Sequence, residues 1–390
     1  MDTLDHLPPL PLFIYYKRII STEQDELGIY HAFRLHDRVC HIELELPPSI
    51  LHKAVTHMDH HFPILEHLSL SFPDTIKNSL PLPLPKAFLA PNLRHFALPS
   101  ISPPRRLRVI TPTVSLVTLE LSNIQTTSYV RPRLLVARLS SLPRLEELSL
   151  SFSIPIPRPS TERGLLGEQR APVTLPSLTD LRFKGVCAYL ESLVAQIRAP
   201  LLKRLMVTFF NQIAFALPHL FHLIDTEWFG LSSTEVSFGP KEVSVAEVLT
   251  DSLWQSKAFS LHVICKPLDW QLDCIAQICH AFIPALSRVE YLSLSIGVDI
   301  PSELWHGAID SATWHDLLRS FIGVKKLQVG PRLLGELSRA LQVGEVGSDP
   351  GFLPNLRSIT AGRNRSRFAS FIEARQVVGR PVQFLQSEYE

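Results

Sequence analysis

The sequence has no marked excess of charge of either sign, because 38 lysines and arginines face 37 aspartates and glutamates. A protein dedicated to nucleic acid usually carries a clear basic excess, so no nucleic-acid partner is predicted. No apolar run reaches the roughly 18 residues that cross a bilayer. Residues 1–20 also lack the basic start and the cleavage site of a secretory signal. These absences predict a cytoplasmic or nuclear protein without a membrane partner.

Cysteines are few and form no pattern. Their number, five, is odd and their positions are scattered, which argues against a disulfide framework. Cys274, Cys279 and His280 fall on one predicted helix, but separations of five and one do not place three ligands on one helix face. We interpret these cysteines as small buried residues.

Motifs for enzymatic chemistry are missing as well. The sequence has no G-x-S-x-G elbow, no Walker-type phosphate loop and no kinase signature, so it predicts no catalytic residue, no cofactor and no enzyme. Its densest polar cluster is His52, His57, His60, His61 and His67, and metal sites do use histidines at such spacings. No His-Glu-x-x-His motif is present, so a solvated helix face is favoured over a metal site, and no metal is predicted.

A strand unit that recurs along the chain is the strongest positive feature. FPILEHLSLSF at 62–72 returns as LPRLEELSLSF at 142–152, with the skeleton apolar-x-x-apolar-x-apolar after a proline or turn. The central apolar residues of the copies lie 23 to 35 positions apart, the spacing typical of a solenoid. These residues are Ile42, Leu68, Phe96, Leu119, Leu148, Leu181, Leu205, Leu292, Leu327 and Ile359, with weaker copies at Val236 and Leu261.

The spacing within each copy predicts how it packs. The last two apolar residues lie two apart, so on a strand they point to one face, inward. A single short strand cannot bury that face, whereas stacked copies share a continuous core that lengthens without thickening. Amphipathic stretches between the copies predict helices at 50–62, 134–142, 189–197, 212–224, 243–254, 270–282, 314–321, 333–343 and 368–377. The predicted fold class is therefore α/β, a solenoid of irregular strand-plus-helix repeats.

The repeats LEHLSLSF, LEELSLSF and VEYLSLSI, with the ending FASFIEARQVVGRPVQF at 368–384, resemble the leucine-rich-repeat portion of fungal F-box and leucine-rich-repeat proteins. The resemblance covers nearly the whole chain from about residue 35. It implies a curved array with a parallel sheet on its concave face, which holds a protein substrate. It also implies an N-terminal F-box helical bundle that binds the Skp1 subunit of a cullin-based ubiquitin ligase.

Two departures from that family are visible. HLPPLPL at 6–12 has the Leu-Pro start of an F-box, but no acid follows and three prolines stand where a helix should begin. The F-box is therefore missing or degenerate, and Skp1 is a doubtful partner. The asparagine or cysteine that many repeats place three residues after the last strand leucine is also absent, and Asn123 lies one residue off that position.

The sequence divides into an N-terminal cap or F-box remnant at 1–36, the repeat array at 37–384 and a tail at 385–390. Thr22 is a candidate helix cap, with acids in the first turn. A long loop at 153–176 interrupts the array and is either a mobile insertion or a partner-contact loop. The loop at 343–355 is predicted to be a plain connector.

The residues that flank the inward leucines point to the opposite, concave face and are the candidate partner-binding residues. They mix aromatic, apolar and charged groups, which suits a protein partner. Three functions stay open: a ubiquitin-ligase substrate receptor, an interaction scaffold with no ligase connection, and, least favoured of the three, an enzyme that uses the histidine cluster. The candidates are His67, His95, Glu120, Glu147, Asp180, Arg182, Arg204, Tyr291, Lys326 and Gln328.

Overall fold

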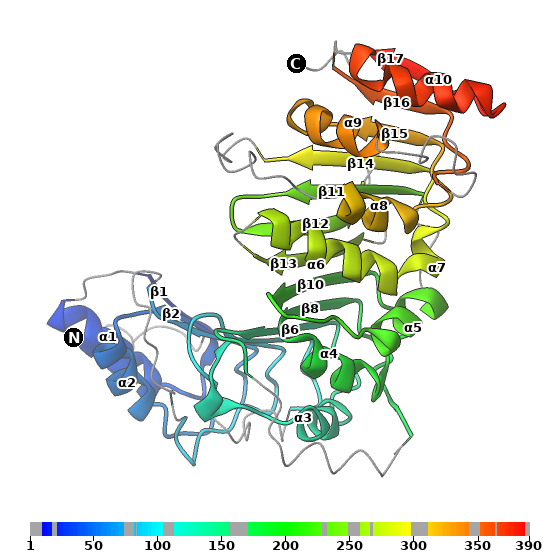
Figure 1. The fold of residues 1–390 in the computed structure, drawn as a ribbon. Coiled ribbons are helices and arrows are strands. Elements are labelled where there is room, and N and C mark those ends of the chain that lie inside the picture. The colour runs from blue at the N-terminus through cyan, green and yellow to red at the C-terminus, as the bar shows by residue number, and fades with distance from the viewer. Residues whose placement is uncertain are drawn as a thin grey trace. The chain divides into compact units, whose positions relative to one another are not determined.

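A computed structural model describes residues 10–17, 22–73, 82, 84–103, 113–156, 171–227, 232–248, 258–265, 268–297, 311–342, 352–362 and 365–386. The chain forms two compact units. Unit 1 contains residues 1–185 and 192–202, and unit 2 contains residues 186–191 and 203–390. Each unit is an α/β arrangement with a mostly parallel sheet (Figure 1).

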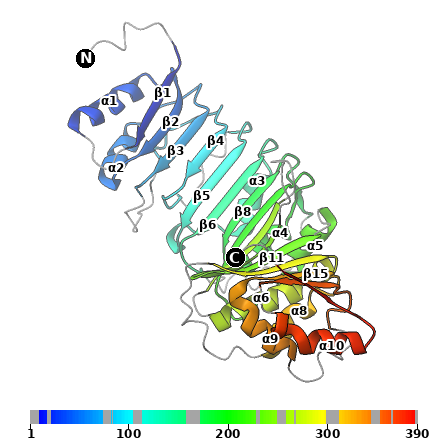
Figure 2. The ribbon, with the colours of Figure 1, turned by 90° about the horizontal axis from the view of Figure 1, so that it is seen from above.

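The strands of unit 1 lie side by side in chain order, and every neighbouring pair is parallel (Figure 2). They are β1 (Leu12–Lys17), β2 (Val39–Glu45), β3 (His67–Ser71), β4 (His95–Leu98), β5 (Thr118–Ile124), β6 (Glu147–Phe152) and β8 (Asp180–Gly185). A separate pair joins β7 (Val173–Thr174) to β9 (Ile197–Arg198). The strand β1 was not predicted, because its sequence, LFIYYK, lacks the leucine skeleton of the later copies.

Alternation along these strands separates a buried face from a half-exposed one. In β3, for example, Leu68 and Leu70 are buried, whereas His67, Ser69 and Ser71 are half-exposed. The central apolar residue of every sequence copy is buried, including Val236 and Leu261 of the two weaker copies. Burial of such a side chain contributes roughly 1.5–3 kcal/mol to the stability of the fold. The prediction that these residues point inward is confirmed.

The helices of unit 1 begin within two residues of the predicted starts but end earlier than predicted. Helix α1 (Glu23–Arg34) starts with a capping box in which the Asp25 amide donates to the Thr22 hydroxyl. It packs against α2 (Pro48–Thr56), which ends six residues short of the predicted 50–62. The 3-10 turn η2 (Thr126–Ser128) and α3 (Pro132–Leu139) follow. Helix α4 (Cys187–Val194) begins in unit 2 and ends in unit 1.

The strands of unit 2 do not follow chain order. Their order is β10 (Arg204–Phe210), β13 (Ala258–Ile264), β12 (Glu242–Glu247), β11 (Ser233–Phe238), β14 (Tyr291–Ile296), β15 (Lys326–Val329), β16 (Ser358–Ala361) and β17 (Gln383–Gln386). Strand β12 is antiparallel to both of its neighbours, β11 and β13, while the other pairs in this unit are parallel.

The predicted helix at 243–254 is therefore wrong where the structure describes it. Val243 and Val245 alternate with polar residues and point inward from β12, so this stretch has a strand period of two. Its hydrogen bonds go to β11 and β13 rather than along a helix. Residues 249–254 of that prediction lie outside the described part of the chain.

The remaining helices of unit 2 succeed one another beside the strands (Figure 1). Contacts join α6 to α8, α8 to α9 and α9 to α10, and the 3-10 turns η5 (Pro331–Leu333) and η7 (Arg365–Phe368) adjoin α9. Their bounds are α5 (Pro218–Glu227), α6 (Leu268–Ala281), α7 (Ile283–Leu286), α8 (Ser311–Arg319), α9 (Leu334–Gln342) and α10 (Ala369–Val377). Helix α5 starts six residues later than predicted, because Pro218 opens it.

A side chain from elsewhere in the chain caps α5. The carboxylate of Glu191 accepts hydrogen bonds from the backbone N–H groups of His219 and Leu220, at 2.9 and 2.8 Å. It also lies 3.0 Å from the Nδ1 atom of His219. Amides at a helix start otherwise lack partners, so this buried acid stabilises the beginning of α5.

Successive sequence repeats are linked by the same backbone bonds. The carbonyl of Glu66 accepts from the amides of Arg94 and His95, and the carbonyl of Arg94 accepts from those of Val117 and Thr118. In unit 2 the carbonyls of Glu290 and Lys325 each accept from two successive amides in the same way. Side chains add a second set of links: Asn92 to Pro63, Ser177 to Pro143 and Asn355 to Ile322, at 2.7, 2.9 and 3.0 Å.

Asn123 contributes although it lies one residue off the position expected in leucine-rich repeats. Its φ of 52° is left-handed, a region that asparagine tolerates. Its side-chain amide donates to the carbonyl of Ser100 at 3.1 Å.

Three predicted segments fall largely or partly outside the described residues. Of the loop at 153–176, residues 157–170 are not described, and its end forms β7. Residues 343–351 of the second loop and residues 387–390 of the tail are not described either. Strand β17 extends to Gln386, so the predicted tail begins within a strand.

Candidate functional site

The half-exposed face of the strands in unit 1 carries side chains aligned from strand to strand. Because the strands are parallel and in register, one row across β1 to β4 consists of Phe13, His41, His67 and His95. We call these four residues the imidazole row, after its three histidines. The same row continues through Thr118, Glu147 and Asp180, and the adjacent row contains Tyr15, Glu43, Ser69, Ala97, Glu120, Ser149 and Arg182.

The rings of the imidazole row contact one another face to face or at a tilt. The His41 and His67 ring centroids are 4.1 Å apart with an interplanar angle of 9°, so these rings are stacked. Phe13 lies 5.7 Å from His41, and His95 lies 5.6 Å from His67, both tilted. At the far end the His95 Nδ1 atom lies 3.1 Å from the Thr118 hydroxyl.

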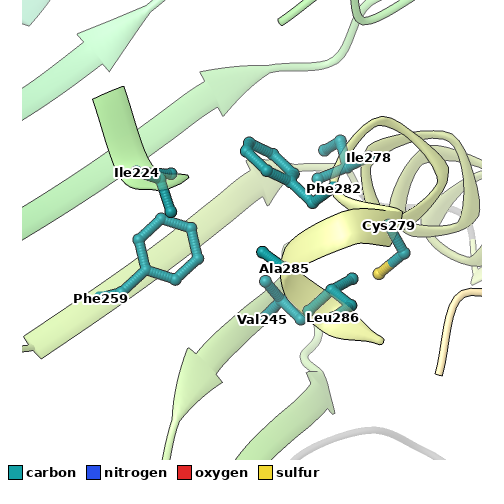
Figure 3. Close-up of a pocket in the computed structure, with 8 residues that line it drawn as sticks. All are labelled: Ile224, Val245, Phe259, Ile278, Cys279, Phe282, Ala285 and Leu286. Carbon is teal, nitrogen blue, oxygen red and sulfur yellow. The ribbon is translucent and has the colours of Figure 1, made fainter. Parts of the chain in front are cut away.

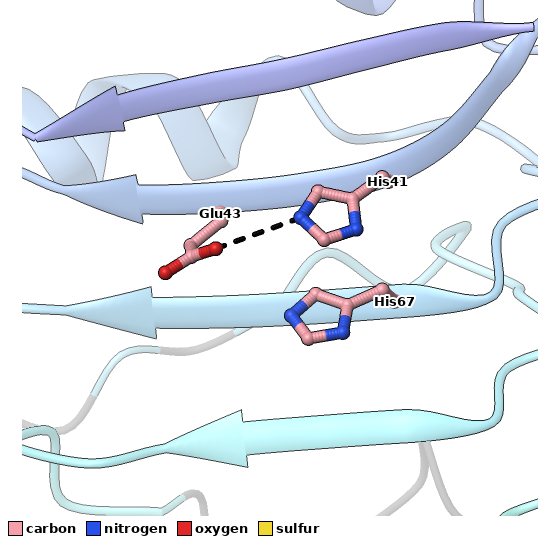
Figure 4. Close-up of side chains that lie close together, drawn as sticks. All are labelled: His41, Glu43 and His67. Atoms are coloured by element: carbon pink, nitrogen blue, oxygen red, sulfur yellow. Dashed lines mark ion pairs between the residues drawn. The ribbon is translucent and has the colours of Figure 1, made fainter.

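Glu43 lies beside the stacked rings (Figure 4). Its carboxylate also pairs with the cation of Lys17. Its Oε1 atom is 2.8 Å from the Lys17 ammonium, and its Oε2 atom is 3.6 Å from the Nε2 atom of His41. The hydrogen bond from Lys17 lowers the pKa of Glu43, although burial acts in the opposite direction. The same hydrogen bond raises the pKa of Lys17, whose ammonium also lies 5.4 Å from the centroid of the Tyr15 ring.

His67 has a strongly lowered pKa. Burial lowers its pKa to about 4, and the neighbouring His41 and His95 act in the same direction. Glu43 acts in the opposite direction and is the smallest of these causes. The ring of His67 is therefore neutral at physiological pH, with a lone pair on one of its nitrogens.

His41, Glu43 and His67 form the group that offers metal-ligand geometry among the described residues. One ligand atom from each lies within 4.8 Å of the others. The side chains of His41 and Glu43 are 25% and 26% exposed, so the group is partly shielded and still reachable from solvent. Neither residue was among the predicted site residues. Both flank Ile42 on its strand, so extending the face assignment to the first sequence copy would have found them.

The predicted face residues of unit 1 lie in these two rows, with one difference in exposure. His67, His95, Glu120 and Glu147 are half-exposed, and Arg182 is exposed. Asp180 is buried at 3% exposure, and its carboxylate accepts a hydrogen bond from the Thr179 hydroxyl at 2.9 Å. Asp180 therefore cannot present a free carboxylate to a partner.

The predicted face residues of unit 2 are distributed over β10, β14 and β15. Arg204 and Tyr291 are half-exposed at the starts of β10 and β14. Tyr291 pairs with the exposed Lys326 in register, and its hydroxyl donates to the side-chain oxygen of Gln328. Burial raises the pKa of Tyr291, with the nearby Glu235 acting in the same direction. The tyrosine hydroxyl is thus a neutral donor already engaged by Gln328.

The histidine cluster that stands out in the sequence does not come together. His57 stacks on Tyr30 at 4.3 Å and His60 stacks on His36 at 4.9 Å. His67 lies on β3 and joins His41 instead. The histidines share only a stretch of sequence, because the helix ends at Thr56 and the chain turns before β3.

Two of the cysteines and one apolar pocket lie in the interior of unit 2. Cys274 and Cys279 are buried on α6, as interpreted from the sequence, and burial raises the pKa of Cys274 to about 12. Cys279 lines a pocket with Ile224, Phe259 and Leu286, among other apolar residues (Figure 3). No polar side chain lines this pocket, so nothing in it would orient a substrate.

Comparisons with known proteins assign no family to this chain. No protein-family model matches it, and no curated protein matches its sequence. In the described part of the chain, no helix combines the length and the apolar character needed to cross a membrane.

Proposed function

We propose that the chain is a non-enzymatic, protein-binding repeat module that binds its partner on the half-exposed face of its strands. The observation that carries the proposal is the register of unit 1, which places imidazole, carboxylate, hydroxyl and guanidinium groups in continuous rows above a buried apolar face. Rows of mixed charge and aromatic character suit a protein surface more than a small molecule or a nucleic acid.

The same reasoning extends to the architecture, which we propose to be a leucine-rich-repeat-like solenoid with the strand face as its concave side. Three observations support this architecture. The leucine skeleton recurs along the chain, successive strands of unit 1 pair with each other, and the same backbone hydrogen bonds link successive repeats. In unit 2 the antiparallel β12 interrupts the succession. Residues brought together by such stacking contact mainly adjacent repeats.

Two versions of this function differ in their connection to a ubiquitin ligase. In the first, which the resemblance to F-box and leucine-rich-repeat proteins suggests, the chain is a substrate receptor that also binds Skp1. In the second it is an interaction scaffold alone. Residues 12–17, where an F-box helix would begin, form β1 and pair with β2 instead. This observation favours the scaffold.

The test is affinity purification of the tagged protein from its own cells, with Skp1 and cullin quantified among the bound proteins. Skp1 at near-equal amounts would establish the receptor version. Absence of Skp1, with a partner that depends on the strand face, would establish the scaffold.

Dependence on the face is measured with matched charge reversals. Glu120→Lys and Arg182→Glu change the half-exposed rows, whereas Lys53→Glu and Arg138→Glu change exposed positions on α2 and α3. We expect the face variants to lose the partner and the helix variants to retain it. Equal retention, or equal loss, in both sets would contradict binding through the strand face.

A further inference from the structure

We propose that His41, Glu43 and His67 bind one divalent transition-metal ion, such as Zn²⁺, on the strand face of unit 1. Two imidazoles and one carboxylate are a ligand set that zinc uses in proteins. The three side chains come from neighbouring strands that the register holds in place: His41 and Glu43 two apart on β2, and His67 directly opposite His41 on β3 (Figure 4). The site does not depend on the proposed protein partner.

The distances are close to those that a metal requires. Three ligand atoms already lie within 4.8 Å of one another. Zinc–ligand bonds of about 2.0–2.1 Å in a tetrahedral site place ligand atoms roughly 3.3 Å apart, so an approach of about 1–1.5 Å is needed. The stacked rings point their nitrogens in parallel directions, and rotation of each imidazole about its side-chain bonds must tilt them toward each other. Side-chain rotation suffices, since the strands themselves are already adjacent.

The neighbours of the site orient the carboxylate. Lys17 pairs with the Oε1 atom of Glu43 and leaves Oε2 directed at His41. A ligating carboxylate that is also hydrogen-bonded by a second group is the usual arrangement around protein-bound metals. Phe13 and His95 flank the two ligand rings and are not themselves among the ligands.

The donor set selects the class of ion. Imidazole nitrogens suit Zn²⁺, Cu²⁺, Ni²⁺ and Co²⁺, whereas Mg²⁺ and Ca²⁺ prefer oxygen ligands. Three protein ligands leave a fourth tetrahedral position, which faces outward because the group is on the half-exposed side of the sheet. Water would fill that position in the isolated chain. A histidine or carboxylate of a bound protein could replace the water, which would give the strand face a metal-dependent attachment point.

The experiment is titration of the untagged 390-residue chain with ZnCl₂ by calorimetry, and with CoCl₂ by visible absorption. We expect one Zn²⁺ per chain and a cobalt spectrum typical of tetrahedral nitrogen and oxygen ligands, without a thiolate charge-transfer band. Glu43→Gln should weaken zinc binding by more than the roughly 10- to 100-fold that loss of an outer-shell partner costs. His41→Phe and His67→Phe, which keep an aromatic ring in the row, should abolish it.

The matched control is His95→Phe, which makes the same substitution one strand further along the row. It should leave the zinc affinity unchanged within about twofold. Failure of the unaltered chain to bind zinc, a thiolate band in the cobalt spectrum, or undiminished binding in His41→Phe and His67→Phe would each overturn the proposal. Circular dichroism of every variant separates loss of a ligand from loss of the fold, and Glu43→Gln tests the site where a histidine variant does not fold.

Discussion

Single positions on the strands differ sharply in what they tolerate, because neighbouring residues point to opposite faces. Leu148 is 1% exposed inside unit 1, whereas Ser149 is half-exposed and lies in register between Glu120 and Arg182. A charge at the first position has no partner and no water, while a charge at the second has both. Substitutions one residue apart therefore report the strand register directly.

We expect Leu148→Asp to destabilise the protein by several kcal/mol, since a buried charge without a partner costs at least that much. Ser149→Asp should change the free energy of unfolding by less than about 0.5 kcal/mol, as surface substitutions usually do. Guanidinium unfolding followed by circular dichroism measures both. Comparable losses in the two variants would show that the assigned register is wrong.

Titration of His67 should make the stability of the protein depend on pH. Its pKa of about 4 in the folded chain lies below the value of about 6.5 in an unfolded chain, so the unfolded state binds more protons between these values. Stability should therefore be complete above pH 6.5 and fall as the pH drops toward 4. We expect a loss of about 1–2 kcal/mol, because the ring is partly exposed and solvent screens its neighbours.

The measurement is urea unfolding from pH 4 to 7 with a chelator present. His67→Gln removes the titrating ring and should flatten the curve over this window, while the titratable groups that surround it, His41, His95 and Glu43, remain. An identical pH dependence in the variant would assign the loss of stability to other groups.

At the scale of elements, hydrogen bonds from residues distant in the sequence stabilise the start of a helix and the segment before a strand. Glu191 caps α5 from a segment 28 residues away in the chain. Arg375 makes a second long-range contact, with the segment before β16. Its guanidinium donates to the carbonyls of Phe352 and Leu353, both at 3.2 Å. Arg375 is buried at 2% exposure, and burial lowers its pKa. A buried arginine of this kind holds α10 against the chain that leads into β16.

We expect Arg375→Met to destabilise unit 2 by about 2–4 kcal/mol, because it leaves two buried carbonyls without these donors. Arg365→Met, at an exposed position on η7, is the matched control and should change stability by less than about 0.5 kcal/mol. Thermal and guanidinium unfolding compare the two. A neutral Arg375→Met would mean that methionine packing compensates for both hydrogen bonds.

Elements were predictable to different degrees for a physical reason. Helices such as α6, α8, α9 and α10 carry an apolar stripe that depends only on neighbouring residues, and their predicted positions hold to within a few residues. Strand β12 was mistaken for a helix because its apolar run is short, and so short a run does not by itself distinguish a strand from a helix. Strand β1 was missed because its sequence lacks the leucine skeleton of the later copies.

At the scale of the whole molecule, the chain is organised as two compact units whose contacts are mainly internal. Their boundary is not a single point, because 186–191 belongs to unit 2 while 192–202 belongs to unit 1. A cut anywhere between residues 185 and 203 would therefore leave one unit incomplete. A destabilising substitution in the interior of one unit should therefore increase local unfolding within that unit first.

We expect Leu148→Asp to raise amide hydrogen exchange in β3 to β8 more than in β14 to β16. Leu327→Asp, which alters a fully buried residue of β15, should show the reverse pattern. Exchange followed by mass spectrometry resolves both sets of strands. Uniform acceleration across the chain in either variant would indicate that the two units unfold as one cooperative body.

The sequence by itself determined the strands of the repeat, the residues they bury and most of the helices, because those properties follow from periods of two and 3.6 among neighbouring residues. Only the tertiary structure decided the strand order β10-β13-β12-β11-β14 and the capping of α5 by Glu191. It also decided that His67 lies against His41 and Glu43 rather than with the histidines near it in sequence. Such pairings depend on which strands become neighbours in space, and the spacing of residues along the sequence does not indicate this.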